Sequence, residues 1–459
     1  MPHIEDTAQQ LAAKLSDCHA DYIEAHLEDS ISSYITYRGK ELETIGKNAS
    51  VGGNIRALVN GGWGFVSFNS LDDLDRCLKL ALEEASIAGK EPRQLADVPV
   101  VVEKVEYHPD KSNPVEIPLA HKKELLDNYN AALWQVPQLQ TSVISYGDGH
   151  KRNIYLNSHG SLIQQERRDV ALNIAAIASD GNQVQQANMS IGSQGEFSAI
   201  QQLDEQVKEL SNRAVELLAA QQAKGGEYTV VLDPILAGVF VHEAFGHLSE
   251  ADFVYENKRM RDLMQLGKRF GRHELNIVDG AALSGMRGSF KYDDEGTPSG
   301  KTYLIKEGVL TSRLHSRETA AKMGEKPTGN ARAINYRHAP IVRMTNTYIE
   351  PGETSFEEMI ADIEEGIYAK NWYGGTTSME MFTFSAGEAY MIRDGKIAEL
   401  MRPVVLTGNV FETLKQIDAI GDDLDMNQGG GCGKGGQSPL PVSNGSPHIR
   451  IQRCLIGGK

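Results

Sequence analysis

An apolar run that leads directly into two histidines and a glutamate is the feature that most constrains this sequence. Asp233 and Pro234 are residue types that favour the N-cap and the first turn of a helix. Residues 235–241 are all apolar or glycine and predict a buried helix, and His242-Glu-Ala-Phe-Gly-His247 follows at once. Polar side chains on a buried helix cost free energy unless they are paired, hydrogen-bonded or bound to a metal. The motif therefore predicts either a metal site or two hydrogen-bonded core histidines with Glu243 in an ion pair.

The spacing of the two histidines predicts a distorted helix. In the familiar zinc motif H-E-x-x-H the histidines are four residues apart and share one helix face. Here they are five residues apart, which on a regular helix leaves the two side chains about 140° apart. One inserted residue, as in a π-bulge, would return them to one face, and Gly246 should make such a distortion less costly. We therefore expect a bulge or bend near residues 243–247.

A catalytic zinc site usually has three protein ligands and one open position, so the motif needs a third ligand. Glu250 is near in sequence, His273 lies in a charged segment typical of a surface loop, and Cys454 alternates like a core strand residue. Cys432 stands among six glycines within residues 427–437, which favours tight turns or a close approach of the backbone to another group. A flexible linker is the alternative interpretation of this glycine-rich segment.

Composition excludes several classes of protein. The net charge is −16, which argues against nucleic-acid binding because that needs Lys and Arg stripes. No run of 18 apolar residues is present, so we expect no membrane span, and the first residues do not resemble a signal peptide. Four cysteines are too few for a disulfide scaffold in 459 residues, which favours a reducing compartment and a cytoplasmic location.

The pattern of elements predicts an α+β protein with three parts. Strand-like segments followed by a helix occur twice in the first half, and many short strand-like segments follow Gly225-Gly226. We expect an N-terminal α+β domain over residues 1–115 and a middle α+β domain over residues 116–227. A β-rich C-terminal catalytic domain should cover residues 228–459 and carry the buried metal-binding helix.

Several segments in the second half, taken in order, resemble the TldD/PmbA family, specifically its TldD-type subunit. The resemblance covers essentially the whole chain and is strongest after residue 228. It is carried by His242-Glu-Ala-Phe-Gly-His247, Tyr292-Asp-Asp-Glu-Gly-Thr-Pro298, Thr328-Gly-Asn-Ala-Arg332, Arg343-Met-Thr-Asn-Thr-Tyr348 and Cys432-Gly-Lys-Gly-Gly-Gln437. One departure is Ala333, where many relatives would have a second arginine.

The resemblance implies a cytoplasmic, zinc-dependent metallopeptidase that hydrolyses unstructured peptides inside an enclosed cavity. It assigns the metal ligands to His242, His247 and Cys432 and the general base to Glu243. PmbA-type members lack the H-E-x-x-x-H motif, so its presence implies the catalytic type. The implied partner is a PmbA-type subunit in a heterodimer or a second copy in a homodimer.

The roles of other polar residues stay open at this point. Asn330 or Arg332 could hold a substrate carbonyl or only a loop, and Asp293 with its two acidic neighbours could support the metal or form a solvated turn. Two further functions compete with peptide hydrolysis. One is a non-catalytic peptide-binding or modulator protein with a structural zinc, and the other is hydrolysis of a different amide bond.

Overall fold

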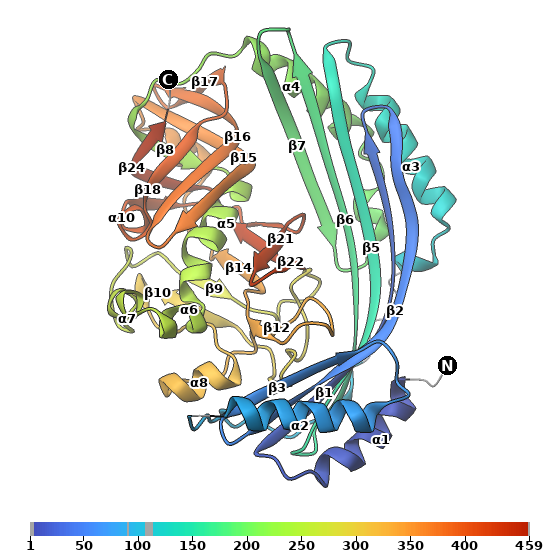
Figure 1. Cartoon of the computed structure of the whole chain (residues 1–459). Helices are drawn as coiled ribbons and strands as arrows, with labels where there is room; N and C mark the ends of the chain where they lie inside the picture. The colour runs from blue at the N-terminus through green and yellow to red at the C-terminus, as the bar shows by residue number, and fades with distance from the viewer. Residues whose placement is uncertain (1–3, 90, 106–112, 458–459) are drawn as a thin grey trace.

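The computed structural model describes residues 4–89, 91–105 and 113–457. It has an α+β architecture with a β-rich C-terminal half, as the sequence predicts. Figure 1 shows a long curved N-terminal sheet with helices on its outer face and the C-terminal half against its inner face. The helix expected to bind the metal lies in the C-terminal half and faces the sheet.

A single seven-stranded sheet forms the N-terminal half. Its order is β3-β2-β1-β5-β6-β4, with β7 also paired to β6. All pairs are antiparallel except β4 with β6. The strands are β1 (Tyr22–Arg38), β2 (Glu41–Val59), β3 (Gly62–Phe68), β4 (Val102–Lys104), β5 (Leu139–Asn157), β6 (Leu162–Ser179) and β7 (Val184–Ser193).

Four helices cover this sheet in two pairs and create two separate cores. Helices α1 (Ile4–Ser16) and α2 (Leu74–Ala88) pack on one end, and α3 (Leu119–Leu133) and α4 (Asp204–Ala219) pack on the other. Strands β1, β2, β5 and β6 are 17 to 19 residues long, so each reaches beyond the width of one core. The predicted boundary at residue 115 thus falls in a connection between elements of one continuous sheet, and residues 106–112 of the preceding segment lie outside the described part.

The C-terminal half contains two larger sheets and two short strand pairs. In the first sheet, five strands close into a ring because β15 pairs with both β8 and β16. It consists of β8 (Gly226–Leu232), β15 (Glu365–Ser378), β16 (Met381–Arg393), β17 (Lys396–Met401), β18 (Val405–Asn409), β19 (Ile417–Ile420) and β24 (Ile449–Gly457). The second sheet consists of β9 (Ile277–Asp279), β10 (Thr302–Lys306), β11 (Val309–Leu310), β14 (Asn346–Ile349), β20 (Asp425–Asn427) and β23 (Ser443–Ser446).

The remaining elements of the C-terminal half, as far as it is described, are two short strand pairs and six α-helices. Two short antiparallel pairs are β12 with β13 and β21 with β22. They span Ala331–Arg332, Ile341–Val342, Gly431–Lys434 and Gln437–Pro441. The helices are α5 (Pro234–Val241), α6 (Ala251–Glu256), α7 (Lys258–Leu263), α8 (Arg317–Met323), α9 (Phe356–Ile360) and α10 (Val410–Lys415). None of the helices in the described ranges is both long and apolar enough to cross a membrane.

Helix α5 packs unusually close to strand β23, and this contact supports a stability prediction. A Cβ atom added at Gly238 would lie 2.9 Å from the backbone nitrogen of Gly445 and 3.0 Å from its Cα. Gly238→Ala should therefore lower the free energy of unfolding by about 1–3 kcal/mol, because two backbones must separate. Urea unfolding checks this against Gly374→Ala, where an added Cβ meets nothing within 4 Å. Equal midpoints for both variants would contradict the prediction.

Candidate metal centre

The helix that carries the histidines is distorted where the spacing predicts. Asp233 caps α5 by accepting a hydrogen bond from the amide of Leu236, and Pro234 stands at its first position. Residues His242–Gly246 then form one π-helical turn, in which the amide of His247 donates to the carbonyl of His242. The imidazole centroids of His242 and His247 are 5.4 Å apart. The prediction of an inserted residue between the histidines is confirmed.

Gly246 has a different role from the one expected. Its φ and ψ are −58° and −51°, which any residue adopts in a helix. A Cβ at this position would instead lie 2.1 Å from the Sδ of Met344, a fully buried residue. The glycine thus makes room for close packing, and the π-turn itself does not need it.

The glycine-rich segment forms the hairpin β21–β22, which brings Cys432 to the two histidines. The left-handed residues Gly435 and Gly436 make its turn. Before the hairpin, the backbone at Gly429 passes so close to Ser190 of the N-terminal sheet that a Cβ there would lie 2.3 Å from it. Cys432 itself is buried. The expected tight turn and close approach are both present, and the linker interpretation is wrong.

The three side chains lie close enough to share one ion. The candidate ligand atoms of His242, His247 and Cys432 all lie within 4.8 Å of one another. The Sγ of Cys432 is 3.6 Å from the Nε2 of His247. Bonds of about 2.3 Å to sulfur and about 2.0–2.1 Å to nitrogen at a tetrahedral angle would separate these atoms by about 3.6 Å. The buried Nδ1 of His242 also has no hydrogen-bond partner among the described residues, so the donor set fits a metal ion.

The electrostatics of the cluster favour the thiolate form of Cys432. Burial alone would raise the pKa of this thiol, but hydrogen bonds and charge from His242 and His247 outweigh burial and lower the pKa to about 5. Burial opposes the charged form of His247 too, yet Glu250 and Cys432 raise its pKa well above the usual value. A thiolate is the form of cysteine that binds metals.

Glu250 and Lys434 connect the helix to the hairpin behind the metal ligands. The Oε2 of Glu250 lies 3.1 Å from the Nδ1 of His247 and 3.0 Å from the Nζ of Lys434. Lys434 also donates to Asp252 at 2.7 and 2.8 Å and to the carbonyl of Val342 at 2.8 Å. The carboxylate thereby fixes the imidazole of His247, and the lysine, two residues after Cys432, fixes the carboxylate.

This connection predicts a loss of metal affinity when Lys434 is removed. Lys434→Met should weaken metal binding about 10- to 100-fold, because Glu250 loses its cation and the hairpin loses three contacts. Competition with a chromophoric chelator measures this. The matched control is Lys415→Met, whose amine pairs, within the described part of the chain, only with Glu412 in an exposed salt bridge. Unchanged affinity in Lys434→Met would show that the hairpin is held without this lysine.

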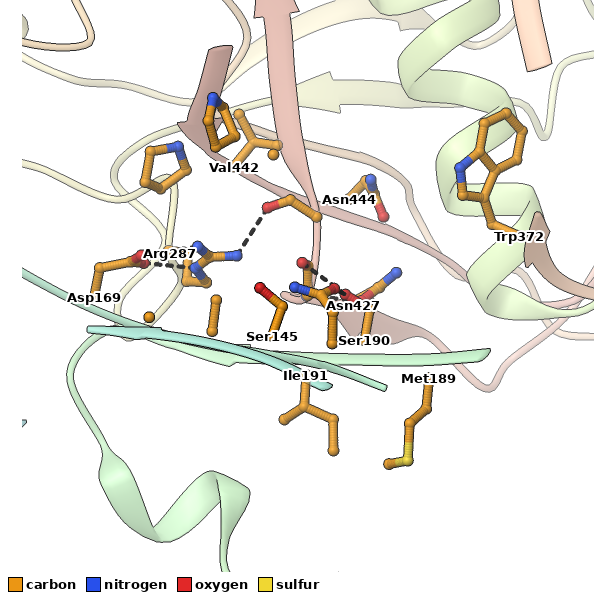
Figure 2. Close-up of a pocket in the computed structure, with 18 of the residues that line it drawn as sticks. Ser145, Asp169, Met189, Ser190, Ile191, Arg287, Trp372, Asn427, Val442 and Asn444 are labelled. Carbon is orange, nitrogen blue, oxygen red and sulfur yellow. Dashed lines mark hydrogen bonds and ion pairs between the residues drawn. The ribbon is translucent and has the colours of Figure 1, made fainter. Parts of the chain in front are cut away.

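A cavity of about 1120 Å³ lies in front of the cluster, between the N-terminal sheet and the C-terminal half. His242 and Glu243 line it, and the side chain of Glu243 is 33% exposed. Figure 2 shows Ser145, Asp169 and Ser190 from the sheet on one side and Trp372, Val442 and Asn444 across from them. Glu243 is therefore the acidic group of the motif that a ligand in the cavity can reach.

Arg287 and Ser190 join the two walls of this cavity beside the hairpin. Arg287 forms an ion pair with Asp169 of β6, at 2.6 Å, and donates to the carbonyls of Gln428 and Gly430. Ser190 of β7 donates to the carbonyl of Gly429. The N-terminal sheet thus holds the segment that leads to Cys432.

The other candidate ligands lie away from the cluster or support it. Glu250 supports His247 from behind, His273 is 72% exposed in its side chain, and Cys454 is buried in the core. Among the described residues, no fourth histidine, cysteine or acid joins the three ligands.

The polar residues near β12 for which the sequence left a role open have mainly structural contacts. Asn330 donates to Asp279 and to the carbonyl of Arg343, and Arg332 donates to the carbonyls of Met344 and Pro441. Asp293 is buried and accepts hydrogen bonds from three backbone amides, at Glu295, Thr297 and Ala331. The solvated turn expected there is wrong, since Asp293 organises a buried turn instead.

Two residues near the site lie in motifs that carry the resemblance, but the sequence assigned neither of them a role. Arg343 is fully buried and donates to the carbonyls of Cys432 and Gln437, one on each strand of the hairpin. Lys434 lies inside the Cys432 motif, and a lysine among six glycines was the available signal for it. Arg343 lies 89 residues before Cys432, a separation that local patterns do not bridge, whereas Lys434 belongs to strand β21 of the hairpin itself.

Comparison with known proteins gives whole-length matches. The family models described as PmbA/TldA metallopeptidase domain 1, central domain and C-terminal domain match residues 24–85, 112–222 and 225–458. A metalloprotease of Synechocystis sp. is 47% identical and the match covers 96% of this chain and 95% of that protein. A zinc metalloprotease TldD homolog of Saccharolobus solfataricus is 30% identical, with 97% and 98% covered.

Solved structures share the fold at low sequence identity. A putative modulator of DNA gyrase from Thermotoga maritima superposes with a TM-score of 0.80 at 18% identity, covering 99% of this chain and 100% of that one. TldE from Thermococcus kodakarensis superposes with a TM-score of 0.76 at 17% identity, covering 98% and 100%. The domain matches and the whole-length relatives establish that this chain belongs to the PmbA/TldD metallopeptidase family.

Proposed function

We propose that this chain is a zinc-dependent metallopeptidase of the TldD type, the catalytic subunit of its family, and that it hydrolyses peptide bonds of unstructured peptides. The observation that carries the proposal is the π-turn, which directs His242 and His247 toward Cys432 and leaves Glu243 in the wall of the cavity. Three ligands with a carboxylate beside them are the pattern of a catalytic zinc site.

Different residues of the chain have different roles in the proposed reaction. His242, His247 and Cys432 hold the ion, and Glu250 keeps His247 oriented. Zinc, when bound, polarises the scissile carbonyl and makes water a better nucleophile. Glu243 accepts a proton from the attacking water and delivers it to the leaving amine. Its Oε2 is 3.9 Å from the Nε2 of His247, close enough to act next to the ligands.

Two features support zinc and an extended peptide as the cofactor and substrate. One thiolate and two imidazoles suit zinc better than hard cations such as Mg²⁺. The cavity lies between the two halves of the chain, so a folded protein would have difficulty reaching Glu243. An unstructured segment can enter such a space.

The competing functions make different predictions at the same site. A structural zinc normally has four protein ligands, whereas three gather here among the described residues. A hydrolase of another amide bond would use the same zinc chemistry with a different substrate. No contact among the described residues favours either alternative over peptide hydrolysis.

Metal analysis combined with peptide assays tests the proposal. The purified chain is expected to contain about one zinc per chain and to cleave unfolded peptides, with activity lost on chelation and restored by zinc. We also propose a cytoplasmic location and a partner, either a PmbA-type subunit or a second copy. Light scattering of the chain alone and mixed with a PmbA-type chain distinguishes the two. A zinc-loaded chain that cleaves no peptide in any of these states would favour the modulator function.

A further inference from the structure

A second pocket of about 310 Å³ adjoins the main cavity and differs from it in charge. The two share Ser32, Asp169, Arg287 and Pro441 in their linings. Leu440, which pairs directly with Cys432 across the hairpin, also lines the second pocket. The pocket therefore lies beside the metal ligands, along the space that a bound peptide would occupy.

The pocket is basic although the chain as a whole carries a charge of −16. Two acidic residues, Glu28 and Asp169, line it. Against them stand six basic residues, Lys151, Arg167, Arg168, Arg287, Arg332 and Arg337. Four of them pair with carboxylates, Lys151 with Glu28, Arg287 with Asp169, Arg167 with Asp294 and Arg168 with Glu166. Arg332 and Arg337 have no such pair among the described residues, and this excess positive charge inside low-dielectric walls attracts anions.

Arg332 is the residue in this lining whose charge is least compensated. It is 2% exposed, its Nε has no hydrogen-bond partner, and no described carboxylate forms a salt bridge with it. Burial and the neighbouring charges of Arg167 and Arg343 outweigh the opposing charges of Asp294 and Cys432 and lower its pKa to about 9. By contrast, the buried Arg56 pairs with Glu24 and Glu295. A buried guanidinium without a carboxylate is costly unless a ligand supplies one.

We infer that this pocket is a subsite for a carboxylate of the substrate. Carboxylates match the planar donor arrangement of arginine and gain strongly from charge-assisted hydrogen bonds. Phe290 lies between these charges in the lining, with the guanidinium carbons of Arg167 and Arg332 at 4.7 and 5.4 Å from its ring centroid. The aromatic ring adds an apolar surface for the carbon chain that bears the carboxylate.

The carboxylate has two sources, the C-terminus of a peptide or an acidic side chain. Either would direct peptides into the cavity so that an anionic group lies next to the hairpin and the scissile bond lies near Glu243. This inference rests on the proposed function, because it assumes that the occupant of the cavity is a peptide. It adds a preference for anionic substrates that the zinc site alone does not confer.

Binding of fluorescent peptides to the zinc-loaded Glu243→Gln chain tests the inference without turnover. The set consists of one N-acetylated neutral peptide with a free C-terminus, its C-terminal amide, the amide with one Gln changed to Glu, and the amide with that Gln changed to Lys. We expect about tenfold tighter binding of the free acid or of the Glu peptide than of the neutral amide, and the weakest binding for the Lys peptide. The better of the two acids identifies the source of the carboxylate.

Substitutions in the pocket lining test whether the preference for anionic peptides comes from this pocket. Arg332→Gln should abolish the preference for the anionic peptides. Arg337 is exposed, so Arg337→Gln should leave the fold intact, and it should reduce the preference about two- to fivefold. The control is Arg453→Gln, since Arg453 pairs with Glu227 and lies outside the lining. Equal affinity for all four peptides overturns the inference. So does a preference that is unchanged both in Arg337→Gln and in an Arg332 variant that folds. Hydrolysis by the unmodified chain is measured separately, so a failure of the proposed function is visible on its own.

Discussion

Replacing Glu243 by glutamine is expected to lower the rate of peptide hydrolysis by about 100- to 10,000-fold while the metal content stays unchanged. Glutamine has nearly the same shape but cannot accept the proton of the attacking water. Glu243 lies in the cavity wall and is not one of the three clustered ligand residues, so its amide should not disturb the metal. The effect should appear in kcat and in kcat/KM alike, because the proton transfer belongs to the transition state.

Steady-state cleavage of an unfolded peptide, measured together with zinc content, checks this result. Glu256→Gln is the matched control, because Glu256 is an exposed residue at the end of α6 and away from the three ligands. Full activity in Glu243→Gln would remove Glu243 from the mechanism. A loss of both zinc and activity would instead make it a ligand.

Local geometry explains which parts of the site the sequence predicts. The number of residues per helical turn is fixed, so a five-residue spacing between His242 and His247 required an inserted residue, and a π-turn is present. The capping of α5 follows from Asp233 and Pro234 for the same reason. These are properties of a few consecutive residues, and no tertiary contact was needed to infer them.

Tertiary contacts explain what the sequence does not predict. Cys432 lies 185 residues beyond His247. Its glycine-rich setting made it a candidate, and only the resemblance to a known motif assigned it as the third ligand. Gly246 is needed for the packing of Met344, a contact invisible in the helix sequence. The strands of the N-terminal half also run through two cores, which alternation of apolar residues cannot show because the pattern is the same at both ends of a strand.

Replacing Cys432 by serine is expected to weaken metal binding by more than about 100-fold and to abolish peptide hydrolysis at the zinc concentration of an ordinary assay. A serine hydroxyl stays protonated near neutral pH, whereas the surroundings of Cys432 favour the thiolate by lowering its pKa to about 5. The two remaining ligands come from one helical turn, and two imidazoles alone hold zinc poorly. Loss of zinc should also remove its stabilisation of the folded state, about 2.7 kcal/mol when free zinc is 100 times the dissociation constant.

Zinc content after dialysis, chelator competition and thermal unfolding with and without zinc measure this prediction. Cys77→Ser is the control, because Cys77 lies on α2 in the N-terminal half. If Cys432→Ser keeps full zinc content, another group is the third ligand, and Glu243, whose Oε2 lies 3.9 Å from the Nε2 of His247, would be the candidate carboxylate. The two variants together separate the functions. A catalytic site loses activity with zinc retained in Glu243→Gln and loses both in Cys432→Ser, whereas a structural zinc leaves Glu243→Gln indistinguishable from the unmodified chain.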